Sequence, residues 1–373
     1  MADPSAAAAP SYGVAAGRLE ALRASLAALS IEAVLITHNE NVAYLSGFTG
    51  LTGDAALVIS RREAILISDF RYAIQAREEA PDFEFHQAEA RLIDAIAEVI
   101  RTRGYPFVGF ERRHLSYDTF TSLSDRLPGV GLTPLRDLVE GLRLTKDETE
   151  VAAIREAAAL ADAAMAHAQS LLRPGVVEAE VALEIEVFLR RRGSQPLPFP
   201  LIVASGERAA LPHATSGDRP MRDGDLVVVD LGARVDGYCS DLTRTVVIGQ
   251  PTEQQREIYR LVWEAQRRGL DAVRAGAAAV EVDASARSFL ADQGYGDRFG
   301  HGLGHGVGRE VHEGPRLGKD SDDRLAAGMV VTVEPGIYLE GWGGIRIEDL
   351  VLVTEGGREI LSRAPKPEDL PSA

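Results

Sequence analysis

The sequence is poor in cysteine and has no long uncharged apolar stretch. Its one cysteine, Cys239, cannot form an intrachain disulfide, so the expected location is a reducing compartment, the cytoplasm. No run of about 18 uncharged apolar residues occurs, which predicts that no segment spans a membrane. The first residues, Met1-Ala2-Asp3-Pro4 and then alanines, lack the basic and long apolar regions of a signal peptide.

Positive charge is also scarce, because 40 Lys and Arg stand against 56 Asp and Glu and give a net charge of −16. A nucleic-acid or anionic-membrane partner would require a basic patch, so neither is expected. The rest of the composition is that of a globular protein, with 45% hydrophobic residues. A chain of 373 residues predicts two domains, each large enough for its own core.

The first domain is expected over residues 17–144, after a flexible leader of small residues and prolines at 1–16. From Gly17 onward, leucines at three- and four-residue spacing predict an amphipathic helix. Strands and helices then alternate, which predicts an α/β domain. The expected strands are 33–37, 55–59, 64–68 and 107–110, and the expected helices are 41–45, 71–79, 92–103 and 117–126.

The second domain, residues 145–373, is expected to begin with Thr145 and Glu148 as the capping box of a long helix that runs toward Leu172. It contains an internal repeat. Each half has a long helix, an Arg-x-Gly segment with a second helix, a pair ending in histidine, an apolar strand ending in an acid, and a later second acid. These features are residues 150–172, 173–193, His213, Asp230 and Asp241 in the first half, and residues 253–273, 274–294, His312, Glu334 and Glu348 in the second. The shared order favours a duplicated α/β unit.

The repeat predicts a metal site. A carboxylate that ends an apolar strand is costly unless it is compensated, although a single one is explained by exposure to solvent. If the halves pack about a pseudo-twofold axis, Asp230, Asp241, Glu334 and Glu348 converge. Their repulsion must then be relieved by raised pKa values or by cations, and hard or borderline divalent ions suit carboxylates.

A histidine ligand is expected from residues 300–308, where His301 and His305 lie among five glycines that permit close approach to a ligand. The alternatives are a turn or a phosphate loop, but no Gly-x-Gly-x-x-Gly follows a strand here. Four carboxylates and one imidazole match a two-metal hydrolase, in which two ions share a bridging water, lower its pKa and polarise the scissile carbonyl. No serine stands in a Gly-x-Ser-x-Gly context. The other histidines, His38, His86, His114 and His167, stand alone in the sequence and are expected to be structural or superficial.

Five segments of the second domain resemble the pita-bread metallopeptidases of the M24 type, the family of methionyl aminopeptidase, aminopeptidase P and prolidase. These segments are 230–233, 237–245, 301–313, 333–338 and 344–349. The resemblance implies an α/β creatinase-type N-terminal domain and a C-terminal α+β pita-bread domain with an internal pseudo-twofold repeat. It implies that Asp230 chelates one ion, that Asp241 and Glu348 bridge both ions, and that His305 and Glu334 complete the shells. Glu334 would also shuttle the proton of the bridging water, and His213 and His312 would contact the substrate and stabilise the tetrahedral intermediate.

Two further observations resemble the branch of this family that cuts before proline. Segments 44–50 and 68–72 resemble its creatinase-type domain, and His301 and Arg346 precede His305 and Glu348 at the spacing typical of proline-specific members. A pocket for proline must accept a rigid ring that has no N–H. His301, Tyr338 and Arg346 are the expected wall of that pocket. Arg309 departs from the pattern, because relatives often carry leucine there.

The expected activity is that of an Xaa-Pro dipeptidase, a prolidase, because the chain is compact with few insertions. The alternative is aminopeptidase P, which acts on longer Xaa-Pro peptides. A dipeptidase must bind the proline carboxylate, and Arg346 or Arg71 is the expected partner. A non-catalytic pita-bread binding module and a metal-free hydrolase like creatinase are disfavoured by the complete ligand set. Manganese is the expected metal, with cobalt or zinc as alternatives, and the family suggests a homodimer.

Overall fold

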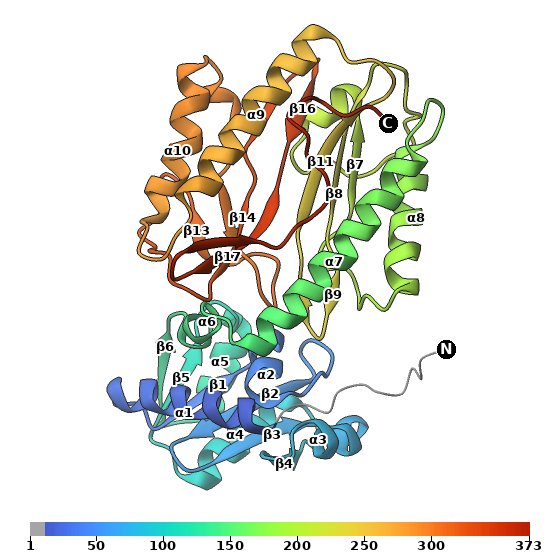
Figure 1. Cartoon of the computed structure of the whole chain (residues 1–373). Helices are drawn as coiled ribbons and strands as arrows, with labels where there is room; N and C mark the ends of the chain where they lie inside the picture. Colours follow the sequence, from blue (N-terminus) through green and yellow to red (C-terminus); the bar gives the residue numbers. More distant parts are fainter. Residues whose placement is uncertain (1–11) are drawn as a thin grey trace. The chain divides into compact units, whose positions relative to one another are not determined.

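The computed structural model describes residues 12–373, and the chain divides into two compact units, Met1–Leu142 and Arg143–Ala373 (Figure 1). The boundary predicted from the sequence, after residue 144, lies two residues further along. The predicted leader is partly wrong, because helix α1 (Tyr12–Ala28) already includes residues 12–16. The rest of that leader, residues 1–11, lies outside the described residues.

The first unit is built on a six-stranded mixed sheet in the order β4-β3-β2-β1-β5-β6. Its strands are β1 (Ala33–Ile36), β2 (Ala55–Ser60), β3 (Ala64–Ser68), β4 (Glu84–Gln87), β5 (Phe107–Glu111) and β6 (Gly131–Leu135). Its other elements are α2 (Asn39–Ser46), η1 (Phe70–Tyr72), α3 (Ala73–Glu79), α4 (Leu92–Arg103), α5 (Tyr117–Arg126) and α6 (Leu138–Arg143).

Strand alternation gives this sheet a hydrophobic core on each face. Val34 and Ile36 of β1 pack in one core with the leucines of α1 and with residues of α2 and α3. Ala33 and Leu35 point to the opposite core, which α4 and α5 complete. The predicted α/β architecture of this unit is confirmed. Strands β4 and β6 were not predicted, because β4 is mostly polar and β6 contains Pro134, which an edge strand tolerates.

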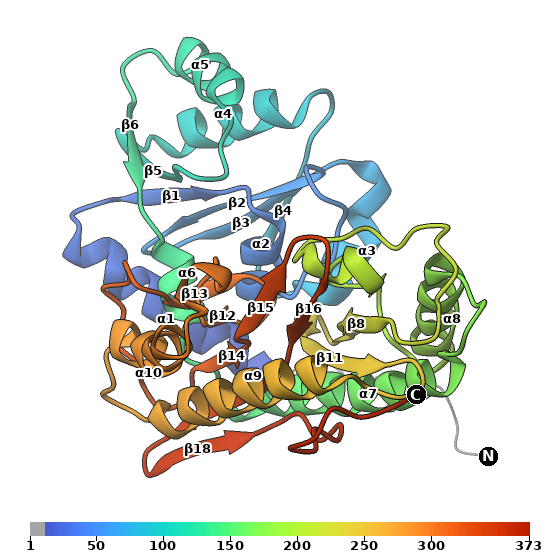
Figure 2. The same cartoon turned by 90° about the horizontal axis from the view of Figure 1, so that it is seen from above.

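The second unit holds two helix pairs outside its strands (Figures 1 and 2). The pairs are α7 (Glu148–Leu171) with α8 (Glu178–Arg191), and α9 (Glu253–Ala272) with α10 (Ala279–Asp292). One sheet has the order β11-β8-β7 and another the order β13-β12-β14-β17-β18. These strands are β7 (Ile202–Ser205), β8 (Leu226–Leu231), β11 (Leu242–Val247), β12 (Gly304–Gly306), β13 (Glu313–Leu317), β14 (Val330–Val333), β17 (Asp349–Thr354) and β18 (Gly357–Ile360). Two short ribbons, β9 (Arg234–Val235) with β10 (Tyr238–Cys239) and β15 (Gly336–Leu339) with β16 (Gly343–Arg346), and the turns η2 (Gly206–Ala210) and η3 (Gly296–Arg298) complete the unit.

The backbone repeats between the two halves of this unit. Each half runs through a long helix, a shorter helix and an antiparallel strand pair, β8 with β11 in the first and β14 with β17 in the second. The residue before each shorter helix forms an isolated bridge, Val177 to Pro220 and Ala278 to Arg324. Positive φ angles recur at matching glycines, at 175 and 276, 193 and 294, and 224 and 328. The predicted duplication is therefore present in the backbone.

The first helix of this unit begins differently from the prediction. Asp147, not Thr145, is the N-cap of α7, and Glu150, not Glu148, returns the hydrogen bond to the cap backbone. Both pairs have the required spacing, so the pattern alone could not decide between them. Thr145 lies instead beside Gly328, where an added Cβ would meet its methyl group at 2.7 Å.

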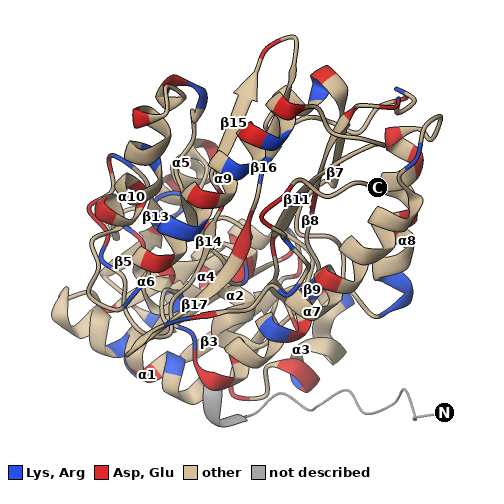
Figure 3. Ribbon diagram, turned by 45° about the horizontal axis from the view of Figure 1, so that its top comes forward, with Lys and Arg blue, Asp and Glu red and all other residues tan. Residues whose placement is uncertain are grey.

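Acidic and basic residues are interspersed on the helices of the second unit, including α8 and α9 (Figure 3). On α9, Arg267 and Arg268 pair with Glu264 one turn away, and Arg260 pairs with Asp369, which lies outside the helix. Among the described helices, none is long and apolar enough to span a bilayer.

Candidate metal centre

The five predicted ligands all lie at or near strand ends in the second unit. Asp230 is the next-to-last residue of β8, and Asp241 directly precedes β11. Glu334 directly follows β14, and Glu348 directly precedes β17. His305 is the central residue of β12, at a point where the pairing with β13 shifts register. Apart from these acids, β8 and β14 are almost wholly apolar and buried, so the polar groups gather where the strands end.

The structure brings these side chains together. Asp241, His305 and Glu348 each offer a ligand atom, and the three atoms lie within 4.8 Å of one another. His305 Nε2 lies 3.6 Å from Asp241 Oδ2 and 3.3 Å from Glu334 Oε1. His305 Nδ1 lies 3.1 Å from the carbonyl oxygen of Gly306, which can only accept a hydrogen bond. Although burial opposes the shift, the hydrogen bond and charge of Glu334 raise the pKa of His305, so without a cation Nε2 also carries a proton. If a cation took the place of that proton, the remaining proton would stay on Nδ1, as in histidines that bind metals.

Asp230 supplies the clearest sign that a cation fits here. Its Oδ2 accepts a hydrogen bond from Arg346 Nη2 at 2.6 Å. Its Oδ1 is buried and has no hydrogen-bond partner in the described part of the chain. A buried carboxylate oxygen without a partner is costly. The donor set of four carboxylates and one imidazole suits divalent ions and would satisfy this oxygen.

The electrostatics of the cluster point the same way. Burial, together with the charges of the neighbouring carboxylates, raises the pKa of Asp241 and of Glu348 well above their ordinary values. Burial also raises the pKa of Asp230, although Arg346 opposes the shift. For Glu334 the effect of burial is outweighed by the hydrogen bond and charge of His305, which bring its pKa down to about 2. If all four carboxyls were ionised, their negative charge would exceed the positive charge of Arg346 and His305.

The three residues predicted to wall a proline pocket form one hydrogen-bonded chain. Arg346 Nη1 donates to the Tyr338 hydroxyl at 3.0 Å, and that hydroxyl lies 3.0 Å from His301 Nε2. Burial lowers the pKa of His301, and its Nδ1 lies 2.8 Å from the Gly302 carbonyl oxygen, so Nε2 accepts from Tyr338. Arg346 is only 4% exposed, and its other donors go to Asp230, to Thr243 Oγ1 at 3.1 Å and to the Pro212 carbonyl.

The other predicted site residues lie in different settings. His312 is exposed, and its ring centroid lies 4.3 Å from that of His305. Burial and the charge of His305 lower the pKa of His312, and the charge of His213 acts in the same direction. His213 is exposed, in the loop after η2. Arg71 belongs to the first unit, where its side chain is 54% exposed and pairs with Asp69 and Asp54.

Two threonines that the sequence analysis did not single out orient the ligands. Thr243 donates to Glu348 Oε2 at 2.7 Å, and Thr332 donates to Glu334 Oε1 at 3.1 Å. Thr332 Oγ1 also accepts from the backbone N–H of His305 at 3.0 Å. Both residues are fully buried on strands. In the sequence, each of these threonines is a polar residue of a strand and lies two residues from a predicted ligand, and this pattern could have identified them.

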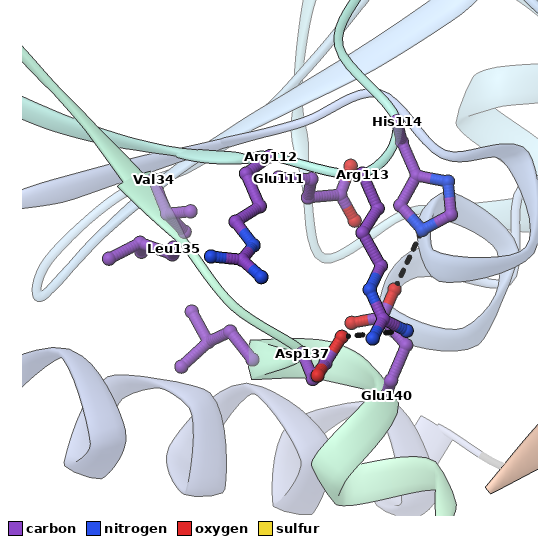
Figure 4. Close-up of a pocket in the computed structure, with 9 residues that line it drawn as sticks. Val34, Glu111, Arg112, Arg113, His114, Leu135, Asp137 and Glu140 are labelled. Carbon is purple, nitrogen blue, oxygen red and sulfur yellow. Dashed lines mark hydrogen bonds and ion pairs between the residues drawn. The ribbon is translucent and has the colours of Figure 1, made fainter.

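A separate polar group in the first unit includes two histidines that stand alone in the sequence. His38 and His114 stack with ring centroids 3.7 Å apart, and His114 Nε2 lies 3.0 Å from Glu140 Oε1. Asn41 donates to both Glu111 and Glu140. A pocket beside this group is lined by Val34, Glu111, Arg112, Arg113, His114, Leu135, Asp137, Leu138 and Glu140 (Figure 4). None of the five predicted ligands belongs to this group.

Both parts of the chain match models of known protein families. The model of "Metallopeptidase family M24" matches residues 152–355, and the model of "Creatinase/Prolidase N-terminal domain" matches residues 18–145. An uncharacterized peptidase of Bacillus subtilis (strain 168), YqhT, is 44% identical over 94% of this chain and 98% of its own length.

Solved structures agree with these matches. The Xaa-Pro dipeptidase from Bacillus anthracis superimposes with a TM-score of 0.92 at 41% identity, covering 96% of this chain and 100% of that one. The X-Pro aminopeptidase from Thermotoga maritima MSB8 superimposes with a TM-score of 0.87 at 36% identity, covering 95% and 99%.

Proposed function

The chain belongs to metallopeptidase family M24, and from this premise we propose that it is an Xaa-Pro dipeptidase, a prolidase that hydrolyses the imide bond before proline. The family makes it a metal-dependent peptidase. The observation that carries the proposal is the convergence of Asp241, His305 and Glu348, with Glu334 beside them and an unsatisfied oxygen on Asp230. The Xaa-Pro dipeptidase similar to this chain over its full length supports the choice of substrate.

We assign the ligands as follows. Asp230 would hold one ion, Asp241 and Glu348 would lie between two ions, and His305 and Glu334 would complete the two shells. Divalent ions bound in such a site polarise the scissile carbonyl and make water nucleophilic at neutral pH. Manganese is the proposed metal because oxygen ligands predominate, with cobalt or zinc as alternatives.

Glu334 is the proposed proton carrier. Its low pKa keeps it ionised at neutral pH, so it can accept the proton that the attacking water loses. As the C–N bond breaks, the same carboxyl would return the proton to the imide nitrogen of proline, which leaves as a secondary amine. Thr332 fixes the carboxylate through Oε1.

The histidines and Tyr338 would handle the substrate without adding charge. Burial lowers the pKa of His301 and of His312, so both rings are neutral at neutral pH. His312, beside His305, and His213 would donate to the carbonyl oxygen as it gains negative charge. His301 and Tyr338 would form the wall against the proline ring. Since the donors of Arg346 are already used, we propose that it supports this wall and Asp230 rather than binding the substrate carboxylate itself.

The test compares Ala-Pro with Ala-Pro-Ala on metal-depleted protein reloaded with manganese, cobalt or zinc. Cleavage of Ala-Pro alone is expected for a prolidase. Glu334→Gln should reduce kcat by about a thousandfold or more, since it removes a group proposed to act in the transition state. Glu340→Gln, at an exposed glutamate in the turn after β15, is the matched control and should behave as wild type. Unchanged turnover by Glu334→Gln would refute the proton-carrier role.

Aminopeptidase P activity is the second candidate, because the X-Pro aminopeptidase of Thermotoga maritima MSB8 is similar to this chain over nearly its whole length. Faster cleavage of Ala-Pro-Ala than of Ala-Pro would select it. Arg71 is the proposed partner of the proline carboxylate in a dipeptidase. Arg71→Met should therefore raise KM for Ala-Pro more than KM for Ala-Pro-amide.

We also propose that the enzyme is a cytoplasmic homodimer. Light scattering coupled to size-exclusion chromatography should give twice the monomer mass. Cell fractionation of the host should place the protein with cytoplasmic markers.

A further inference from the structure

The loop between β12 and β13 carries His312 and ends in a buried ion cluster. Glu313 directly follows His312, and its side chain is 6% exposed. Arg143 Nη2 donates to Glu313 Oε2 at 2.6 Å, and Lys146 Nζ donates to Glu313 Oε1 at 2.7 Å. The side chains of the two cations are 2% and 1% exposed. A carboxylate held by two buried cations is fixed far more firmly than an ion pair on the surface.

The same cluster closes the other end of the loop. Arg143 also donates to Glu310 at 3.0 Å, so two cations face two carboxylates in this cluster. The carbonyl of Glu310 accepts from the backbone N–H of Gly308 at 3.0 Å. Gly308 packs so closely that a Cβ there would lie 2.2 Å from Glu313 Oε1. The loop is therefore held at both ends by the carboxylate that follows His312.

The cations themselves are anchored to the start of the second unit. The backbone N–H of Lys146 donates to the carbonyl of Gly328, just before β14, and Nζ also contacts the carbonyl of Leu144 at 3.3 Å. A Cβ on Gly314, the next residue after Glu313, would meet Leu144 Cδ2 at 2.7 Å. The cluster thus connects the His312 loop to rigid backbone beside the strand that leads to Glu334.

We propose that Glu313, clamped by Arg143 and Lys146, is a positioning residue that holds His312 against the metal centre. The inference rests on the proposed function, in which His312 stabilises the reacting carbonyl. The carboxylate of Glu313 bonds Arg143, Lys146 and the backbone of Glu310 rather than a proposed metal ligand, so it acts through the main chain of the residue before it. Without its charge Lys146 would lose the carboxylate that its Nζ contacts and Arg143 would lose one of the two that it contacts, and the loop would move to let water reach the buried cations.

A double-mutant cycle tests the coupling. On Ala-Pro, Glu313→Gln and His312→Ala should each lower kcat by about 10–100-fold with KM changed less than about threefold, as for groups that act only in the transition state. Because Glu313 acts through His312, the double variant should be no slower than His312→Ala alone. If the two losses multiply, Glu313 does not act through His312 and the proposal is overturned.

Two measurements keep the result interpretable. Lys146→Met should lower kcat while Lys146→Arg restores most of it, and Lys319→Met, at an exposed lysine just after β13, should have no effect. Equal losses in the Met and Arg variants would contradict the clamp. NMR of the metal-depleted protein should show shifted and broadened His312 ring signals in Glu313→Gln. The NMR measurement needs no substrate, so unchanged His312 signals would overturn the positioning role whatever the enzyme cleaves. A failure to cleave any Xaa-Pro peptide would instead refute the proposed function.

Discussion

Replacing Thr243 should show most clearly that residues behind the proposed metal ligands hold them in place. Its hydroxyl donates to Glu348 Oε2 at 2.7 Å and accepts from Arg346 Nε at 3.1 Å, so one oxygen joins a proposed bridging ligand to the arginine that holds Asp230. Thr243→Val keeps the shape and β-branching of the side chain and removes only this oxygen. The change therefore isolates the hydrogen bonds from the packing.

The expected size of the effect on manganese affinity follows from the burial of Glu348 and Arg346, the two partners of the Thr243 hydroxyl. Glu348 is 2% and Arg346 4% exposed, so water cannot replace the missing hydroxyl. A hydrogen bond to a charged group contributes about 1.5–3 kcal/mol. Changes to residues that orient metal ligands typically weaken metal affinity by about 10–100-fold, or about 1.4–2.7 kcal/mol. We expect Thr243→Val to raise the Kd for manganese by that factor in a titration of metal-depleted protein.

Thr245→Val is the matched control. Thr245 lies two residues along the same strand and is equally buried, but within residues 12–373 its hydroxyl bonds only the backbone of Arg346, at 2.9 and 3.1 Å. It should cost folding stability without a comparable change in manganese affinity. Equal affinity in wild type and Thr243→Val, or equal weakening in both variants, would refute the reasoning.

Three other outcomes are expected. Because burial and the neighbouring carboxylates raise the pKa of Asp241 and of Glu348, protons compete with cations at these groups, so manganese affinity should rise as the pH increases and manganese binding should release protons; a Kd that does not change with pH would contradict this. Gly304→Ala would place a Cβ 2.0 Å from the Thr332 carbonyl oxygen, so circular dichroism should show a large fall in Tm and atomic absorption a loss of bound metal. Asp147→Ala removes the N-cap of α7 and should lower the free energy of unfolding in urea by about 1 kcal/mol, with turnover unchanged.

The convergence of the four acids could be predicted from sequence because its signals are local and duplicated. Asp230 and Glu334 end apolar strands in two halves with the same order of elements, and Asp241 and Glu348 follow each strand at similar distances. Two halves that pack alike bring such acids together whatever the exact strand bounds. The α/β class of the first unit followed from hydrophobic periodicity, whereas the fold of the second was implied by the repeat and by the resemblance to the pita-bread metallopeptidases.

Other features depend on contacts that no local pattern encodes. The sequence marks Arg346 by its spacing from Glu348, but its partners Asp230, Thr243 and Tyr338 come from three other elements. Asp147 rather than Thr145 is the helix cap, and Thr145 packs instead against Gly328, which is far away in the sequence. The pairing of Glu313 with Arg143 spans 170 residues of sequence, and only the folded chain makes it visible.

The proposed mechanism depends most on the five side chains forming one site for two ions. Crystals of the protein grown with manganese should show two anomalous difference peaks at the manganese edge, both within ligand distance of Asp241 and Glu348. One peak should also contact Asp230, and the other His305 and Glu334. A single peak, or peaks away from these residues in crystals of protein that hydrolyses Ala-Pro, would contradict it.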